Sequence, residues 1–226
     1  TVGYNLTELT NDITGSTPAS FEPVQDYVVV KIPRFDFPKF ASTDDVLGTS
    51  MQSVGEVMSM ASTFTESLTK AIRSLEIGKT GIRNIDNRFI NLDRLELEKE
   101  IAIPRPRRIF AVLEALRRNW SVSKISNLSY IDEWFLFEIE KSFNVNQETT
   151  PTTILKMLGW TEDDIDIKDI KDELSKNRVY KLVDTCSAEF SSITPYLYST
   201  TGTEDDDISS NKEKVVVIGS GPNRIG

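Results

Sequence analysis

The side chains that most often carry enzyme chemistry are nearly missing from these 226 residues, which include no histidine and a single cysteine, Cys186. Histidine titrates near neutral pH and is the commonest metal ligand. Without it, Ser-His-Asp and Cys-His catalysis and the usual catalytic zinc sites are excluded within this sequence. One cysteine also excludes an internal disulfide and favours a reducing compartment. Carboxylate–Mg²⁺ chemistry with phosphates is the main route left open.

A glycine-rich stretch is the first candidate for phosphate binding: Gly219-Ser220-Gly221-Pro222-Asn223-Arg224-Ile225-Gly226, after the apolar run Val215-Val216-Val217-Ile218. Such loops bring backbone N–H groups close to phosphates, and the N-terminus of the following helix adds attraction. The sequence given does not include that helix. A packed strand and turn is therefore favoured over nucleotide binding by these residues alone.

Five arginines form a second candidate, a basic patch around a predicted helix: Arg105, Arg107, Arg108, Arg117 and Arg118. Such a cluster can contact phosphate backbones. However, the net charge is −9 and no base-stacking aromatic residues are interleaved with the arginines. We therefore favour a solvated helix face or a salt-bridged subunit contact.

A run of aspartates has the composition of a cation site: Asp163, Asp164, Asp166, Asp169 and Asp172. It lacks the central glycine and terminal glutamate of a calcium loop, so an exposed acidic helix is the better interpretation. Cys186 is expected to pack as a small buried hydrophobe, because no histidine can activate it.

The elements that would position these residues are mainly helical. The N-terminal part combines a short helical pattern (Leu6, Leu9 and Ile13, ended by Gly15) with a strand over 27–32 that ends or meets a sheet edge at Pro33. A helix then begins with the capping-box spacing of Thr63 and Glu66 and ends at a left-handed Gly78. The apolar face of that helix is Phe64, Leu68, Ala71, Ile72 and Leu75.

Residues 79–199 are predicted to form a small helical bundle without strands. Its four apolar faces are Ile109/Val112/Leu113/Leu116, Ile131/Trp134/Phe135/Ile139, Ile154/Leu155/Leu158 and Ile165/Ile170/Leu174. Residues 200–213 read as a solvated acidic linker and 214–218 as a further strand. No apolar run reaches the roughly 18 residues of a membrane helix.

Several stretches, taken in order, resemble the large subunit of carbamoyl phosphate synthetase. They are Thr17-Pro18-Ala19-Ser20-Phe21-Glu22-Pro23, Asp26-Tyr27-Val28-Val29, Lys31-Ile32-Pro33-Arg34-Phe35, Ser53-Val54-Gly55-Glu56-Val57-Met58, Ile131-Asp132-Glu133-Trp134-Phe135-Leu136, Val183-Asp184-Thr185-Cys186-Ser187-Ala188-Glu189-Phe190 and Gly221-Pro222-Asn223-Arg224-Ile225-Gly226. One departure is Ala61-Ser62, which stands where the family usually has Gly-Arg.

The resemblance implies a connecting segment of a larger ATP-using enzyme. Residues 1–73 would be the end of the first ATP-grasp (carboxyphosphate) domain, 74–210 the helical oligomerisation or connection domain, and 211–226 the first strand and glycine-rich loop of the second pre-ATP-grasp domain. The expected fold class is accordingly mainly α, a helical bundle flanked by α/β pieces. We expect no catalytic, cofactor-binding or metal-binding residue in this segment, because the family's sites match positions outside it.

The same resemblance implies what the parent enzyme does. The family is a ligase that makes carbamoyl phosphate from bicarbonate, glutamine-derived ammonia and two ATP, with Mg or Mn, for arginine and pyrimidine biosynthesis. Expected partners are the remaining ATP-grasp domains, a glutaminase subunit or domain, and further copies through the helical domain, but neither nucleic acid nor membrane. Localisation would be cytoplasmic, with an organelle left open.

The hypothesis for this segment is that the bundle, with Ile109, Leu113, Trp134 and Phe135 in its core, is a rigid spacer between two catalytic halves. The alternative is a stand-alone helical protein-interaction module.

Overall fold

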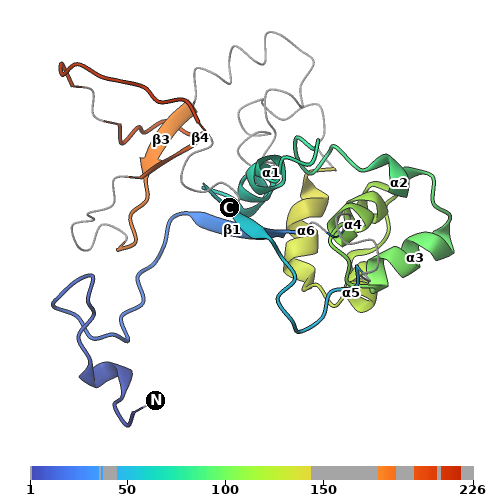
Figure 1. Ribbon diagram of the computed structural model, residues 1–226, viewed down its shortest axis with the longest axis horizontal. Helices are drawn as coiled ribbons and strands as arrows, with labels where there is room; N and C mark the ends of the chain where they lie inside the picture. The colour runs from blue at the N-terminus through green and yellow to red at the C-terminus, as the bar shows by residue number, and fades with distance from the viewer. Residues whose placement is uncertain are drawn as a thin grey trace.

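The computed structural model describes residues 2–35, 37, 45–143, 178–186, 196–207 and 210–219. Helices dominate a mixed α/β architecture in which helix α1 (Phe64–Ser74) lies between a helical cluster and a β-hairpin (Figure 1). The predicted third and fourth bundle helices and the aspartate run of 163–172 fall outside the described residues. None of the described helices has the length and apolar character that crossing a bilayer requires.

The N-terminal arm is more extended than its sequence pattern predicts. Leu6–Glu8 forms only a single 3-10 turn, closed by Glu8, whose carboxylate accepts from the Asn5 N–H at 2.8 Å. The predicted helix through Ile13 is wrong, because the chain turns back in an isolated bridge between Thr10 and Pro18. The apolar residues of the arm remain exposed instead of forming a buried helix face.

Strands β1 (Val28–Arg34) and β2 (Gly55–Ala61) form a two-stranded antiparallel sheet. β1 continues through Pro33, which lies opposite Glu56, because an edge strand does not need the N–H group that proline lacks. Of the two predicted alternatives, the strand therefore does not end at Pro33; this residue lies in an edge strand. Helix α1 packs on this sheet and buries Leu68, Ala71 and Ile72.

Helix α1 begins at the predicted Thr63 cap, but the carboxylate of Glu66, the other half of the predicted capping box, bonds Thr200 and Lys70, and the helix ends earlier than predicted. The hydroxyl of Thr63 accepts from the N–H of Glu66 at 3.3 Å, as an N-cap should. The helix closes at Leu75, and the left-handed residue after it is Glu76, with φ of 54°. Gly78 is also left-handed, with φ of 73°, but it lies two residues further on and turns the following loop.

The helical cluster consists of α2 (Asn87–Ile90), α3 (Arg94–Ala102), α4 (Arg108–Arg117), α5 (Val122–Ser129) and α6 (Glu133–Lys141). α4 is central: it contacts each of the other four helices, and Phe110 to Leu116 are all buried. The sequence predicted that one face of α4 is buried, but the structure buries residues on all sides of the helix. Its buried ring is completed by Phe110, Ala111 and Ala115.

The predicted face of α6 is partly wrong. Leu136 and Ile139 are buried, whereas Trp134 is 53% and Phe135 42% exposed. Four successive large apolar residues, Trp134 to Phe137, cover every side of a helix, so their spacing cannot say which side faces the core. Packing against the rest of the chain decides, and it places Leu136 in the shared core cluster.

The second half of the described chain contains a β-hairpin that the helical prediction missed. β3 (Arg178–Leu182) pairs antiparallel with β4 (Leu197–Thr201). Two later predictions also need correction. Residues 204–207 are held along β3 by hydrogen bonds instead of being free linker. Residues 214–218 are exposed and form no strand in the described chain.

Candidate functional site

The five arginines considered as a basic patch form hydrogen bonds and ion pairs with groups of the same chain. Glu114, fully buried in α4, accepts two hydrogen bonds from Arg117 at 2.7 Å each and one from Arg118 at 2.6 Å. Burial acts to raise the pKa of the Glu114 carboxyl, but these bonds and charges outweigh it and hold the pKa below its usual value. The group is therefore a carboxylate, buried but fully paired.

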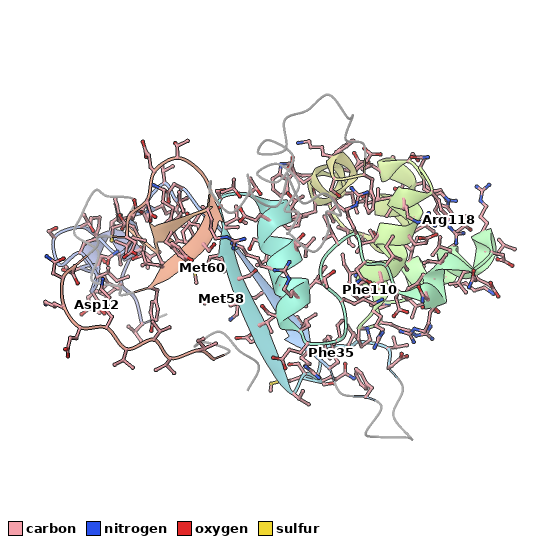
Figure 2. All side chains as sticks on the ribbon, turned by 90° about the horizontal axis from the view of Figure 1, so that it is seen from above. Asp12, Phe35, Met58, Met60, Phe110 and Arg118 are labelled. Carbon is pink, nitrogen blue, oxygen red and sulfur yellow. The ribbon has the colours of Figure 1, made fainter. Side chains whose placement is uncertain are left out.

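Arg118 also fastens α2 to α4. Its guanidinium donates to the carbonyl oxygens of Phe89 at 3.0 Å, Ile90 at 2.8 Å and Leu92 at 2.9 Å. These carbonyls lie at and beyond the end of α2, where backbone acceptors lack helical partners. Figure 2 shows Arg118 at the end of the helical cluster remote from the sheet. The available sequence signal was a glutamate amid apolar residues with arginines three and four positions later.

The remaining arginines have partners in the same chain. Arg105 contacts Asp45 at 2.9 Å and Glu100 at 3.0 Å, and Arg107 contacts Asp86 at 2.6 Å. Arg108 donates to the Ser129 carbonyl at 3.3 Å, and burial lowers the pKa of its guanidinium. Ion pairing is as expected, but its acidic partners are intramolecular, so these arginines are not an open phosphate-binding surface.

A polar joint connects α1 to the hairpin, and we call Ser62, Glu66, Lys70, Ser199 and Thr200 the hairpin joint. The Thr200 hydroxyl donates to Glu66 at 2.7 Å and lies 3.0 Å from the Ser62 hydroxyl. Lys70 donates to the Ser199 carbonyl and contacts Glu66 at 3.1 Å. Residues separated by more than 130 positions in the sequence thus share one largely buried network.

Lys70 also reaches back to the sheet. Its ammonium donates to the carbonyl of Met60 at 3.0 Å, at the hairpin end of β2 (Figure 2). Burial lowers the pKa of Lys70, and the Glu66 carboxylate opposes that shift. Three elements, β2, α1 and β4, therefore meet at a single ammonium group.

The N-terminal arm adds two further contacts to the hairpin. The rings of Tyr27 and Tyr198 lie 5.9 Å apart, and Gln25 donates to the Thr185 carbonyl at 2.8 Å. Burial is the main cause that raises the pKa of Tyr198 to about 12. The phenol is therefore neutral and unsuited to act as a base at physiological pH.

The remaining sequence candidates show no catalytic arrangement. Cys186 is buried, as predicted for a small hydrophobe. Gly219 is open to solvent, and the rest of its glycine-rich stretch lies outside the described residues. Within the described part of the chain, no group of three or more Asp, Glu, His or Cys residues could hold a metal ion. At the departure from the family pattern, Ala61 is buried and Ser62 belongs to the hairpin joint.

Comparison with known proteins identifies the setting of this geometry. The family profile described as carbamoyl-phosphate synthetase large chain, oligomerisation domain, matches residues 56–188. Similar proteins include the carbamoyl phosphate synthase large chains of Deinococcus radiodurans (44% identical) and Archaeoglobus fulgidus (42%). Another is the arginine-specific chloroplastic large chain of Arabidopsis thaliana (40%).

Each of these alignments includes all of this chain but only 21–23% of the relative. The profile covers the sheet strand β2, α1, the helical cluster and β3, which carry most of the core, but it ends before β4, which supplies Ser199 and Thr200 to the hairpin joint. The resemblance seen in the sequence is thereby confirmed: the chain belongs to the carbamoyl phosphate synthetase large-chain family and carries its oligomerisation domain.

Proposed function

We propose that this chain is the structural connection within a carbamoyl phosphate synthase large chain. In this proposal, residues 1–73 end the first ATP-grasp domain, 74–210 form the oligomerisation or connection domain, and 211–226 begin the second pre-ATP-grasp domain. The parent enzyme makes carbamoyl phosphate from bicarbonate, glutamine-derived ammonia and two ATP. The chain itself supplies no catalytic group.

One observation carries the proposal: α1 and the helical cluster share a single core. Leu68 and Ile72 of α1 belong to the same buried cluster as Phe110 and Leu113 of α4, and Ile32 of β1 packs against it. A core that is continuous across residue 73 gives the sheet and the helices a fixed relative placement, because well-packed interiors resist deformation.

Fixed placement has a chemical purpose in this reaction. Carbamate and carboxyphosphate decompose in water. The two phosphorylation sites must therefore be held at a fixed separation, so that the intermediate can pass between them along a route closed to solvent. A rigid spacer serves that need without touching a reactant. The proposed partners are the remaining ATP-grasp domains and a glutaminase, with ATP and Mg or Mn bound elsewhere in the parent, in the cytoplasm or an organelle.

The test is the stoichiometry of the full-length enzyme carrying Ile72→Ala. Removing this buried side chain leaves a cavity between sheet and helices and costs about 2–5 kcal/mol. We expect more ATP to be hydrolysed per carbamoyl phosphate formed, while each half retains its partial ATPase reaction. Leu95→Ala, at a 67% exposed position on α3, is the control. An unchanged ratio in a folded Ile72→Ala enzyme would exclude the spacer role.

Protein contact is a second candidate function, favoured by the aromatic surface of α6. Trp134, Phe135 and Phe137 are each more than 40% exposed, and Phe64 of α1 lies beside the first two, with ring centroids 5.6 and 5.2 Å away. Clustered exposed aromatic rings are typical of protein interfaces. Replacing Trp134 and Phe137 by alanine should lower the mass of any oligomer in sedimentation, and an unchanged mass would remove this surface from consideration.

A further inference from the structure

The outer edge of strand β3 carries backbone groups that no strand in the described chain satisfies. Successive N–H groups of a strand point to opposite sides. Those of β3 that face β4 are paired within the hairpin. The N–H groups of Tyr180 and Leu182 point away from β4, toward the outer edge of the hairpin. At such an edge a strand normally exposes its N–H donors to water or to another chain.

The acidic strap, residues 204–207, lies along this edge. The Tyr180 N–H donates to a carboxylate oxygen of Asp205 at 3.2 Å, and the Leu182 N–H donates to Asp206 at 2.9 Å. The Asp206 N–H in turn donates to the Tyr180 carbonyl at 2.9 Å. Two side-chain carboxylates and one backbone group thus occupy the places of a neighbouring strand.

Charge reinforces the contact. Lys181 lies 3.1 Å from the Asp206 carboxylate and 3.8 Å from Glu204. The hydrogen bond from Leu182 is the main cause that lowers the pKa of Asp206, which therefore accepts as a carboxylate at neutral pH. Hydrogen bonds to a charged acceptor are stronger than those between neutral groups. They hold in place a segment whose four adjacent acidic side chains would otherwise favour a solvated coil.

The members of the strap do not contribute equally. Asp205 and Asp206 accept the edge N–H groups, whereas the side chain of Glu204 is 86% exposed and makes only the longer ion pair. Asp207 is exposed, and its backbone N–H donates to Asp205 at 3.0 Å. Two carboxylates are therefore built into the edge, and two add charge beside it.

We propose that the acidic strap closes the outer edge of β3, through Asp205 and Asp206, against pairing with a β3 strand from a second copy of this chain. An exposed edge is a template for strand addition, and the same edge of two copies can pair antiparallel about a two-fold axis. The strap satisfies the edge donors internally and places negative charge where an approaching copy would bring its own. It acts as an intramolecular substitute for a neighbouring strand.

The test compares two double variants with the same change in charge. Asp205→Ala/Asp206→Ala removes both acceptors, and Glu204→Ala/Asp207→Ala removes two charges but leaves the edge bonds. Hydrogen exchange at the Tyr180 and Leu182 amides should accelerate about tenfold or more in the first variant, consistent with losing bonds to charged acceptors. Its sedimenting mass should rise with concentration. The second variant should match the parent chain in both measurements.

Amide protection in α4 reports whether each variant is folded. If the first variant loses that protection, the single variant Asp206→Ala replaces it. Hydrogen exchange is then measured at the Leu182 amide, and Asp207→Ala is the control. Unchanged exchange at the edge amides would overturn the proposal. Faster exchange with an unchanged mass would overturn it too, because an opened edge that recruits no second copy needed no closure.

Discussion

At the scale of single residues, Glu114 is a charged carboxylate whose side chain is fully buried. An isolated buried charge is costly, and this one is retained because Arg117 and Arg118 supply three hydrogen bonds to it. The arginines remain partly exposed, with side chains 48% and 25% accessible. Glu114 is therefore the group whose removal or protonation disrupts the pairing.

The pH dependence of stability follows from the depressed pKa of Glu114. A carboxyl group whose pKa is lower in the folded chain contributes stability that is present above its unfolded value, near 4.5, and is lost as the pH falls through the folded value. We expect Glu114→Gln to lose about 2–3 kcal/mol of unfolding free energy at pH 7, as for a hydrogen bond to a charged group. Below pH 4.5, the unfolding free energy of Glu114→Gln should also fall less steeply with decreasing pH than that of the unsubstituted chain.

Urea unfolding, followed by circular dichroism between pH 7 and pH 3, measures both effects. Glu213→Gln, at an exposed position, removes the same charge and should leave the curve of the parent chain unchanged. Parallel pH profiles for Glu114→Gln and the parent would contradict the assignment, because they would mean that the Glu114 carboxyl binds protons equally in both states.

At the scale of elements, the loop after α1 passes so close to the helix at Gly81 that this position has no room for a side chain. A Cβ built at Gly81 would lie 2.6 Å from the Cγ2 methyl of Thr69, which is itself buried. No pattern in the sequence distinguishes Gly81 from any other loop glycine. A glycine is required here by close approach to the helix.

Gly81→Ala should therefore destabilise the chain by about 1–3 kcal/mol, the usual cost of overpacking. Thr69→Ser removes the opposing methyl group and keeps the hydroxyl. The double variant Gly81→Ala/Thr69→Ser should recover most of the loss, and thermal unfolding of the four members of this cycle measures the coupling. Additive effects of the two substitutions would show that the contact does not limit the site.

The elements predicted from sequence were those whose signals are local. The Thr63 cap and the 3.6-residue spacing of Leu68, Ala71 and Ile72 place α1 without knowledge of its neighbours. The hairpin was missed because its two strands pair across residues 182 to 197 and show no strong alternation of their own. The joint at Thr200 was missed for the same reason: its partner Glu66 is 134 positions away.

At the scale of the whole molecule, the described chain has two kinds of connection. The helical cluster is joined to α1 and the sheet by an apolar core, whereas the hairpin, on the other side of α1, is joined to it by polar groups (Figures 1 and 2). An apolar core is lost only by opening the fold. A polar joint depends on a few hydrogen bonds, so we expect the hairpin to separate from α1 more easily than the helices do.

Thr200→Val tests that difference, because it keeps the shape of a buried side chain and removes the hydroxyl that donates to Glu66. A buried charged acceptor that loses its donor costs about 2 kcal/mol, which corresponds to roughly thirtyfold faster exchange through local opening. We expect that acceleration at the β4 amides only, with α4 unchanged, when hydrogen exchange is measured residue by residue. Thr200→Ser restores the hydroxyl and should restore protection. Equal acceleration in β4 and α4 would contradict the two-connection view, since it would mean that hairpin and helices open together as one unit.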